Sequence, residues 1–237
     1  MRVDFELPGL AGRVDDLRRA FTEVVAEPFA MSWRIEPASR RKRLAVFVSR
    51  EDHCLLELLW QQRAGDLRAD VAMVIGNHEA LGYVAHQWGV PFHHVPVEAG
   101  QHQEAEKRHR ELLADDVDAV ILARYMQIVS AMFVAEWRNR MINIHHSFLP
   151  AFVGAKPYDQ AHKRGVKLIG ATAHYVTEEL DAGPIIEQDV QRVDHRQRVA
   201  DLRRIGRQIE RTVLARAVRW HVEDRVLVHG NRTVVFA

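Results

Sequence analysis

Short, almost uninterrupted apolar runs alternate with longer amphipathic segments through most of this 237-residue chain. The first run is Leu44–Val48, and a segment with the pattern of a one-faced apolar helix follows it at His53–Arg63. The later runs predict strands at Asp70–Ile75, Phe92–Val97, Val117–Leu122 and Met141–His145, and the intervening segments predict helices at Glu79–Trp88 and Gln101–Leu113. Apolar runs without polar alternation are typical of strands buried on both faces of a parallel sheet. The pattern predicts an α/β fold with a doubly wound, mostly parallel sheet and a Rossmann-like core.

The pattern changes after Met141–His145. Longer strands are predicted at Ile169–Val176 and Pro184–Gln191, and a long helix at Arg196–His221. The tail reads as a hairpin, with Arg225–Val228 and Thr233–Phe236 as its strands and Gly230-Asn231 at the turn.

The first part of the chain differs from the rest. It predicts a strand at Arg2–Leu7, a helix at Gly12–Val25 and a strand at Met31–Ile35, which together are too small to bury a core. We therefore expect two parts, residues 1–39 and 40–237. The basic run Arg40–Arg43 at their junction has no aromatic residue within it, which favours a solvated linker over a nucleic-acid patch.

Composition narrows the function classes. The 33 Lys and Arg residues balance 32 Asp and Glu residues, so the net charge of +1 gives no reason to expect a nucleic acid or an anionic membrane as partner. The single cysteine, Cys54, rules out an intrachain disulfide framework and a Cys-rich zinc module. No run approaches about 20 apolar residues, and the start lacks a signal-peptide pattern. We expect a soluble, cytoplasmic protein.

Two polar residues close the strand at Met141–His145. Asn143 and His145 are two positions apart, so their side chains point to the same face of a strand. Such strands carry ligands at their carboxyl ends. An Asn amide can donate to an oxyanion and an imidazole can move a proton near neutral pH. The alternative is that both residues merely end the strand.

A second candidate is the polar loop Thr177–Pro184. Asp181 precedes an Ala-Gly-Pro turn that would hold its carboxylate in one orientation, although a turn aspartate can also simply cap local amides. Amide, imidazole and carboxylate together suit acyl-group chemistry without a metal.

These segments resemble the folate-dependent formyltransferase family. The first matching blocks are Asn143–His145, Ser147–Pro150 and Leu180–Pro184. Within the family, the formyltetrahydrofolate deformylases are the most similar group, on Ser49–Leu55, His145–Phe152, Gly154–Tyr158, Arg164–Lys167 and Ile169–Val176. The resemblance extends from about Arg40 to His221, and several long blocks are more specific than one short motif. It implies a formyltransferase-like fold for residues 40–237.

The resemblance implies hydrolysis of 10-formyltetrahydrofolate to tetrahydrofolate and formate, which would serve one-carbon metabolism and purine biosynthesis. Ribonucleotide formyltransferases carry a Gly/Ser-rich phosphate loop after the first strand, whereas the turn Ser49–His53 has no glycine and two carboxylates. A basic RNA-binding extension, as in methionyl-tRNA formyltransferases, is not expected after the last helix. Water is then the expected acceptor. Formyl transfer to a small amine and a non-catalytic folate-binding regulator are the alternatives.

The resemblance also assigns roles. Asn143 and protonated His145 would hydrogen-bond the formyl oxygen, and Asp181 would position and deprotonate the attacking water. The folate would be the substrate, with no separate cofactor and no metal. Its pteridine ring would lie between two loops, read by backbone groups of the first. The residues expected to bind it are Tyr125, Met126, Gln127, Ile128, Val129, Thr177, Glu178, Glu179 and Leu180. The alternative is that Met126, Ile128 and Val129 merely begin a buried helix.

Other residues invite a metal or nucleophile interpretation that their spacing opposes. His93-His94 and His145-His146 are adjacent pairs whose side chains would face opposite sides of a strand, unlike the i, i+4 pairs of helical metal sites. Cys54 beside His53 would point about 100° away from it on a helix, so we expect a packing role for this thiol.

The first 39 residues resemble the later half of an ACT domain, so we expect a partial α+β ACT-like segment. The family pattern would carry a further strand, helix and strand before Met1, and the start therefore reads as internal to such a domain. Val14, Leu17, Phe21 and Val24 would form an uncovered apolar face. The sequence predicts that a second copy of the chain covers this face and that the protein is a homo-oligomer.

Overall fold

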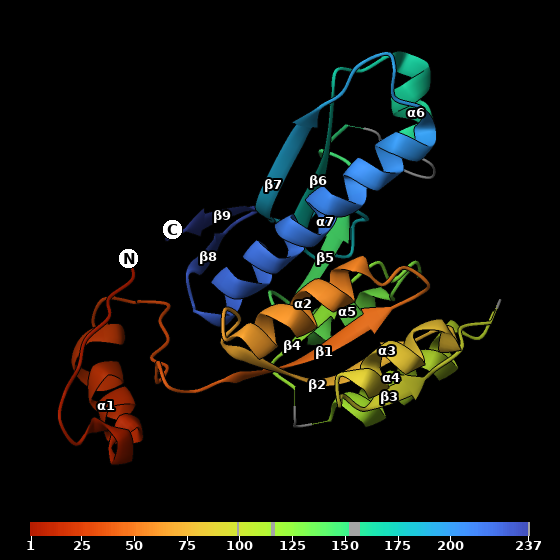
Figure 1. Ribbon diagram of the computed structural model, residues 1–237. Helices are drawn as coiled ribbons and strands as arrows, with labels where there is room; N and C mark the ends of the chain where they lie inside the picture. The colour runs from red at the N-terminus through yellow and green to blue at the C-terminus, as the bar shows by residue number, and fades with distance from the viewer. Residues whose placement is uncertain (99, 115–116, 152–156, 237) are drawn as a thin grey trace. The chain divides into compact units, whose positions relative to one another are not determined.

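A computed structural model describes residues 1–98, 100–114, 117–151 and 157–236 (Figure 1). The chain forms two compact units, Met1–Arg41 and Lys42–Ala237. Within the second unit, Phe152–Lys156 of the sequence motifs named above lie outside the described residues. No helix in the described part of the chain is long and apolar enough to cross a membrane.

A seven-stranded sheet in the order β3-β2-β1-β4-β5-β6-β7 forms the centre of the second unit. The strands are β1 (Lys42–Val48), β2 (Ala69–Gly76), β3 (Phe92–His94), β4 (Ala119–Leu122), β5 (Met141–His145), β6 (Leu168–Tyr175) and β7 (Ile185–Arg192). The pairs among β1 to β5 are parallel, whereas β6 and β7 are antiparallel. The predicted α/β fold with a mostly parallel sheet is confirmed.

Helices cover both faces of this sheet. They are η3 (Glu79–Leu81), α2 (His53–Ala64), α3 (Gly82–Gln87), α4 (His102–Leu113), α5 (Ala131–Glu136), α6 (Pro157–Arg164) and α7 (Val199–Val222). Alternate residues of β1 enter different cores: Leu44 and Val46 pack in the cluster that includes residues of α2 and α7, whereas Phe47 packs in the cluster with residues of α4 and α5. The uninterrupted apolar runs of the strands are explained by this two-sided burial.

The connections determine where ligands can bind. Because β1 leads into α2 and β4 leads into α5, the chain turns to opposite faces of the sheet from two adjacent strands. The carboxyl ends of β1, β4 and β5 lie at one edge, beside this switch point, where open α/β sheets form a crevice. Residues that directly follow these strands are therefore candidates for the site.

Most predicted elements are confirmed with shifted ends. The predicted strand Phe92–Val97 stops at His94, although Val95 N still donates to Gly76 O at 2.9 Å. The long helix begins at Val199, three residues later than expected, and the Asp201 carboxylate accepts from Arg198 N at 3.0 Å to cap it. The C-terminal hairpin forms from β8 (Val226–His229) and β9 (Arg232–Val235).

The first unit differs from its prediction. Its helical elements are η1 (Leu10–Gly12), α1 (Val14–Phe21) and η2 (Thr22–Ala26). The strands predicted at Arg2–Leu7 and Met31–Ile35 are wrong, because no strand forms among residues 1–41, whose backbone is fully described. A strand needs a neighbouring backbone to pair with. Here the Arg18 guanidinium donates to Ile35 O at 3.0 and 2.8 Å, and the Phe21 and Trp33 rings lie 4.9 Å apart, so side chains hold the second segment to the helix.

Candidate active site

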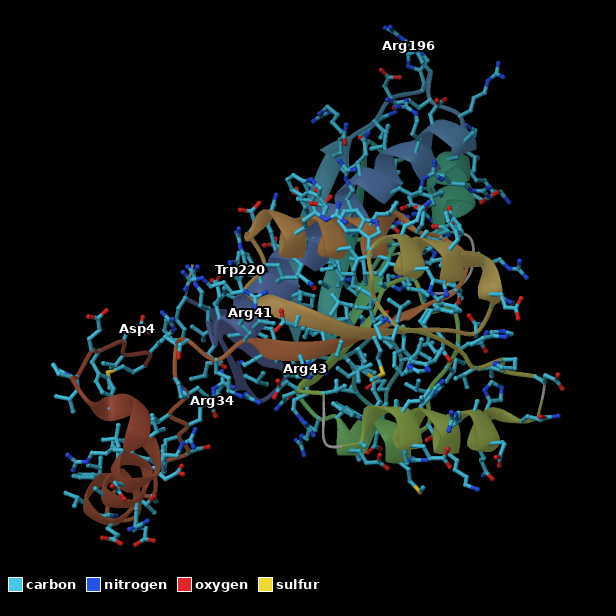
Figure 2. All side chains as sticks on the ribbon, turned by 60° about the horizontal axis from the view of Figure 1, so that its bottom comes forward. Asp4, Arg34, Arg41, Arg43, Arg196 and Trp220 are labelled. Atoms are coloured by element: carbon cyan, nitrogen blue, oxygen red, sulfur yellow. The ribbon has the colours of Figure 1, made fainter. Side chains whose placement is uncertain are left out.

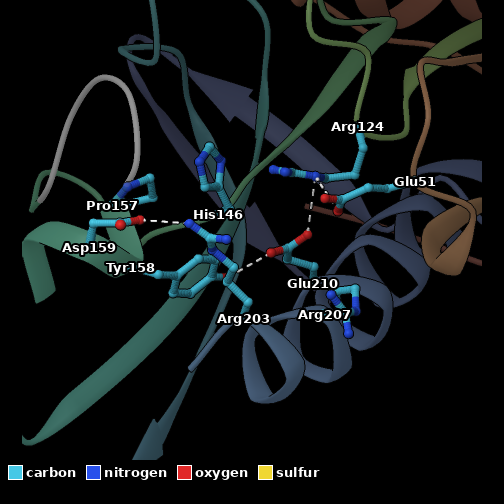
Figure 3. A pocket seen from close by; sticks show the side chains of 9 residues that line it. All are labelled: Glu51, Arg124, His146, Pro157, Tyr158, Asp159, Arg203, Arg207 and Glu210. Carbon is cyan, nitrogen blue, oxygen red and sulfur yellow. Dashed lines mark hydrogen bonds and ion pairs between the residues drawn. The ribbon is translucent and has the colours of Figure 1, made fainter. Parts of the chain in front are cut away.

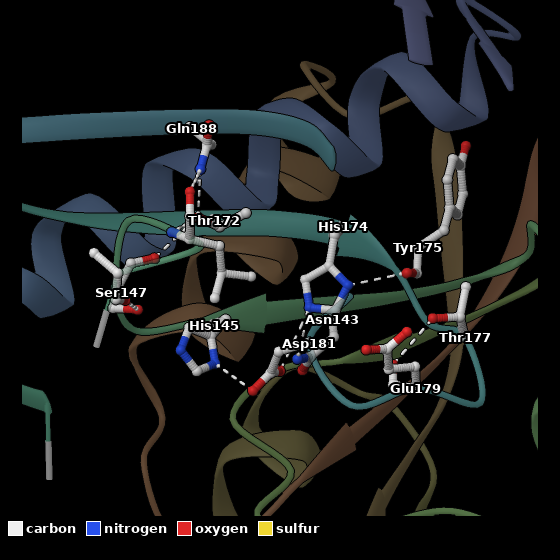
Figure 4. Close-up of polar contacts among 12 residues, drawn as sticks. Asn143, His145, Ser147, Thr172, His174, Tyr175, Thr177, Glu179, Asp181 and Gln188 are labelled. Carbon is white, nitrogen blue, oxygen red and sulfur yellow. Dashed lines mark hydrogen bonds and ion pairs between the residues drawn. The ribbon is translucent and has the colours of Figure 1, made fainter. Parts of the chain in front are cut away.

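The strand β5 brings two of the predicted residues to the edge of the sheet. Its antiparallel pairing with β6 places Asn143 opposite His174 and His145 opposite Thr172. The Thr172 hydroxyl donates to Ser147 O at 2.9 Å and accepts from Leu149 N at 3.0 Å, so it fixes the chain that leaves the strand. The polar end of β5 is thereby held rigidly against β6 (Figure 4).

The loop after β6 carries the third predicted residue, Asp181, back to β5. Tyr175 N donates to Pro184 O at 2.9 Å and closes the loop. Gly183 lies so close to the Tyr175 carbonyl that a Cβ at this position would be 1.8 Å from its oxygen, so only glycine fits. Asp181 itself has φ +56°, in the left-handed region that Asp tolerates better than most residues. The Ala-Gly-Pro turn therefore aims the carboxylate.

Four polar side chains meet at this point. We call Asn143, His145, His174 and Asp181 the histidine cluster. Asp181 Oδ2 lies 3.3 Å from His145 Nδ1, and Asp181 Oδ1 lies 3.7 Å from His174 Nε2. Asn143 Nδ2 lies 3.3 Å from His174 Nε2. Amide, imidazole and carboxylate thus converge as the sequence predicted, with a second imidazole that the sequence reasoning did not single out (Figure 4).

The electrostatics of the cluster keep its carboxylate ionised. The hydrogen bond from His145 holds the pKa of Asp181 well below its usual range, against the effect of burial. His145 is 6% exposed, and its Nε2 is buried without a hydrogen-bond partner among the described residues. One imidazole nitrogen is therefore oriented by a carboxylate while the other remains available for a ligand.

His174 fixes the orientation of the Asn143 amide. Its Nδ1 lies 2.9 Å from Tyr175 O, and because a carbonyl oxygen only accepts, Nδ1 carries the hydrogen. In the neutral ring Nε2 then has to accept, and it does so from Asn143 Nδ2. This contact distinguishes the amide nitrogen from the amide oxygen and leaves the second N–H of Asn143 free to donate.

The residues predicted to bind a pteridine ring lie on two loops. On the first, Tyr125 is buried against Phe47 with ring centroids 5.2 Å apart, whereas Met126 and Ile128 are exposed. A cavity beside this loop is lined by Gln127, Ile128 and Val129 together with side chains of α4. On the second loop, Thr177 Oγ1 donates to Glu179 O at 3.0 Å, and Glu178, Glu179 and Leu180 are exposed.

A second group of polar side chains, mostly buried apart from Glu51, lies at the carboxyl ends of β1 and β4. We call Glu51, His53, Arg124, Tyr158 and Glu210 the arginine cluster. Glu210, whose side chain is 1% exposed, accepts from Tyr158 OH at 2.6 Å and pairs with His53 Nε2 at 2.9 Å. Arg124 Nε lies 3.3 Å from Glu51 Oε2 and 3.4 Å from Glu210 Oε2. Sequence reasoning did not find this cluster, because its members are up to 159 positions apart.

One group of side chains has the spacing of metal ligands among the described residues: His53, Cys54 and Glu210, with ligand atoms within 4.8 Å of one another. Two features oppose a cation there. Arg124 already lies 3.4 Å from the same Glu210 oxygen that pairs with His53. Burial, followed by the charge of Glu210, raises the pKa of the Cys54 thiol well above its ordinary value, so the thiolate form that binds metals is disfavoured.

Comparison with known proteins yields consistent similarities. Residues 42–218 match a family model described as Formyl transferase. A protein named formyltetrahydrofolate deformylase from Bacillus subtilis is 54% identical over 237 residues, covering 100% of this chain and 79% of that protein. A protein of the same name from Mycobacterium tuberculosis is 56% identical over 235 residues, covering 99% of this chain and 76% of that protein.

Comparison with solved structures shows the same similarity. A formyltetrahydrofolate deformylase from Pseudomonas syringae is similar with a TM-score of 0.92 and 50% identity, covering 99% of this chain and 76% of that one. A glycinamide ribonucleotide transformylase from Symbiobacterium toebii has a TM-score of 0.79 and 31% identity, covering 88% of this chain and 100% of that one. The backbone of the sheet and its helices is thus shared by a protein named as a deformylase and one named as a transformylase.

Proposed function

The chain belongs to the formyltetrahydrofolate deformylase family, and from this premise we propose that it hydrolyses 10-formyltetrahydrofolate to tetrahydrofolate and formate. The observation that carries the proposal is the contact of Asp181 with His145, beside Asn143, at the end of β5. Hydrolysis of a formamide needs a donor for the developing oxyanion, an acceptor that holds water and a route for protons. The histidine cluster offers all of these groups.

In the proposed mechanism the formyl oxygen accepts hydrogen bonds from Asn143 Nδ2 and from protonated His145 Nε2. Both donors are positioned beforehand, by His174 and by Asp181 respectively, so little reorganisation is needed when the oxyanion forms. The ionised Asp181 carboxylate accepts a hydrogen bond from the attacking water. Water oxygen bonds to the formyl carbon, and a tetrahedral intermediate results.

The low pKa of Asp181 limits how long it keeps a proton. A carboxylate stabilised in its ionised form is a weak base, so it takes the proton of the attacking water only as the new bond forms. The proton then passes to the folate nitrogen as the carbon–nitrogen bond breaks, and formate leaves. This chemistry uses side chains and water, with no redox step.

The test of hydrolysis is formate release without an amine. Purified protein incubated with 10-formyltetrahydrofolate alone is expected to release formate and tetrahydrofolate in equal amounts over many turnovers. Asp181→Asn, prepared in the same way, is the control for contaminating activities. Turnover that begins only after an amine acceptor is added would contradict the proposal.

We propose that the pteridine ring lies between the loops Tyr125–Val129 and Thr177–Asp181. Support comes from their positions, since the first follows β4 and the second carries the carboxylate. Exposed Met126, Ile128 and Leu180 offer apolar surface on these loops. Met126→Asp and Leu180→Asp should each raise KM for the folate more than they lower kcat, whereas a fall in kcat alone would place the ring elsewhere.

We also propose that the first unit is covered by a second copy of the chain. Its large apolar side chains are more than two-fifths exposed at Val3, Phe5, Leu7, Val24, Phe29 and Met31. Surfaces of this kind in monomers are small or functional. Sedimentation of the whole chain and of a version beginning at Arg43 should give an oligomer and a monomer, respectively. A monomer in both cases would contradict the proposal.

A further inference from the structure

The switch point of the sheet is filled in this chain. In a doubly wound sheet, the crevice between two strands that lead to opposite faces is the usual place for a ligand. Here it would open between the ends of β1 and β4. The residues at these ends, Glu51 and Arg124, instead contact each other at 3.3 Å.

Arg124 spans this crevice. Its guanidinium side chain is 10% exposed, and besides Glu51 it pairs with Glu210 on α7. Figure 3 shows the arginine reaching from the end of β4 between these two carboxylates. The turn after β1, the turn after β4 and the long helix are thus joined through one side chain.

Arg124 also has an unusual backbone conformation. Arg124 has φ +62°, a conformation that strains residues other than glycine. The chain therefore holds an unfavourable backbone conformation while its side chain makes two ion pairs. Glycine would adopt this conformation without strain, so what the arginine adds at this position is its side chain.

Further contacts hold the crevice closed. Tyr158 OH donates to one carboxylate oxygen of Glu210, and His53 Nε2 contacts the other. Gly206 makes room for the tyrosine, since a Cβ at this position would lie 1.9 Å from the hydroxyl oxygen of Tyr158. Ser49 Oγ accepts from Met126 N at 3.0 Å, which ties the turn after β1 to the loop after β4. The crevice is closed by side chains from both of its walls.

What remains is a pocket of about 170 Å³ above the arginine cluster. This space has room for water molecules, and because Arg124 and Glu210 line it, a ligand as large as a ribonucleotide would have to push this ion pair apart. His146 lines the pocket, and its ring lies 5.2 Å from that of His145, so the pocket adjoins the histidine cluster (Figure 3).

We propose that Arg124 determines the acceptor: by bridging Glu51 and Glu210 it closes the switch-point crevice to amine-bearing nucleotides and leaves room for water. The inference rests on the proposed hydrolysis and explains how a backbone shared with a protein named glycinamide ribonucleotide transformylase would serve a different acceptor. A competing ligand would have to separate the buried pair of Arg124 with Glu210 and the partly exposed pair of Arg124 with Glu51, and this cost would exclude it.

The two reactions differ only in the attacking atom. With water, oxygen bonds to the formyl carbon, the bond to the folate nitrogen breaks, and formate is released. With an amine, nitrogen bonds to the formyl carbon, the same bond breaks, and the proton lost by the amine ends on the folate nitrogen. Opening the crevice should divert part of the formyl flux from formate to an N-formyl product.

The experiment compares Arg124→Gly with the wild-type chain, using glycinamide ribonucleotide and, separately, glycinamide as acceptors. Glycine removes the side chain and suits the backbone conformation. Arg124→Gly with Glu210→Gln also removes the carboxylate that would be left without its arginine. Arg216→Gly, which removes an arginine that pairs with Asp189, is the matched control. The readout is the ratio of N-formyl product to formate, which does not depend on the fraction of folded enzyme.

We expect this ratio to rise about tenfold or more with the ribonucleotide in either Arg124 variant, and to stay at the wild-type value in the control. An unchanged ratio in both variants overturns the proposal. Calorimetry on the wild-type chain provides a second measurement that needs no variant to fold: it should detect no binding of glycinamide ribonucleotide at millimolar concentration, and binding overturns the proposal. If the wild-type chain releases no formate without an amine, the proposed hydrolysis itself has failed.

Discussion

The histidine cluster and the arginine cluster are built from the same kinds of side chain but hold their carboxylates differently. In the arginine cluster both oxygens of Glu210 are engaged at short range, by Tyr158 OH at 2.6 Å and by His53 Nε2 at 2.9 Å. In the histidine cluster the contacts of Asp181 are 3.3 and 3.7 Å long. Both carboxylates have a lowered pKa, so ionisation alone does not distinguish them.

The difference lies in what each carboxylate can still accept. Glu210 is enclosed by an imidazole, a hydroxyl and a guanidinium, and such a group contributes to stability and shape. Asp181 is held loosely enough to accept a further hydrogen bond, and the neighbouring His145 Nε2 has no partner among the described side chains. The two carboxylates thus differ in the acceptor capacity that they retain, whereas both clusters keep buried nitrogens without a hydrogen-bond partner among the described residues: His145 Nε2 in one, and His53 Nδ1 and Arg124 Nε in the other.

The largest expected effect on kcat comes from neutralising the loosely held carboxylate of Asp181. Asp181→Asn keeps the shape of the side chain but removes its charge, so kcat for formate release should fall by roughly 10²–10⁴ while the folate still binds. The free energy of unfolding should change little by comparison. Asp189→Asn, at a carboxylate that pairs with surface Arg216, is the control and should keep its activity. A near-wild-type kcat in Asp181→Asn would remove this residue from the mechanism.

In the arginine cluster, by contrast, removing the carboxylate should mainly change the stability of the protein. Glu210→Ala leaves Arg124 and His53 buried without their shared partner, so the free energy of unfolding should fall by about 3–5 kcal/mol. Denaturation in urea measures this loss. Glu57→Ala removes a carboxylate that pairs with exposed Arg211 at 3.7 Å and accepts from Gln61 Nε2 at 2.8 Å, and should cost about 1 kcal/mol or less. Equal losses of unfolding free energy in the two variants would show that the buried contacts of Glu210 contribute no more to stability than the contacts of Glu57.

Acid should weaken the arginine cluster through Glu210. Burial alone raises the pKa of this carboxyl group, but the hydrogen bond from His53 and the charge of Arg124 outweigh it and lower the pKa from 4.5 to about 2. Because the pKa is lower in the folded state, the stabilisation is complete above pH 4.5 and is lost as the pH falls toward 2. The unfolding free energy of the wild-type chain should therefore decrease more steeply across this window than that of Glu210→Gln. Parallel curves would contradict the shifted pKa.

The sequence predicted the parts of the molecule that follow from local pattern. Uninterrupted apolar runs predicted the strands, and the two-residue spacing of Asn143 and His145 predicted their common face. The position of Asp181 before an Ala-Gly-Pro turn predicted an oriented carboxylate, and Gly183 shows why the turn is tight. These inferences needed only neighbouring residues and the alternation of a strand.

Long-range register and long-range pairing were beyond the same reasoning. His174 enters the site because β6 runs antiparallel to β5 in a register that opposes it to Asn143, and sequence alone does not fix that register. The pairing of Glu51 with Arg124 and Glu210 joins distant elements in the same way. The strands predicted at Arg2–Leu7 and Met31–Ile35 were wrong because strand formation depends on a partner, which alternation within one segment does not supply.

His174 offers a smaller effect within the histidine cluster. His174→Ala removes the acceptor that orients the Asn143 amide, and one hydrogen bond of this kind corresponds to about a tenfold fall in kcat. KM should change less, since the residue positions Asn143 and is not assigned to folate binding. His174→Gln can restore an acceptor and should recover part of the loss. An unchanged kcat in His174→Ala would show that Asn143 needs no such support.

The smallest effect is expected at His146, which directly follows β5; contrary to the expectation that the two side chains face opposite sides, its ring lies 5.2 Å from that of His145. Burial, followed by the charge of Arg124, lowers the pKa of His146 to about 4, so its ring is neutral at pH 7 and supplies no cation to an oxyanion. Its ring lies 6.0 Å from that of Tyr158, over the arginine cluster. His146→Ala should therefore lower kcat by less than about tenfold, whereas His145→Ala should match Asp181→Asn. Equal losses at the two histidines, measured by formate release at pH 7, would mean that both rings reach the formyl group and that the two clusters act as one site.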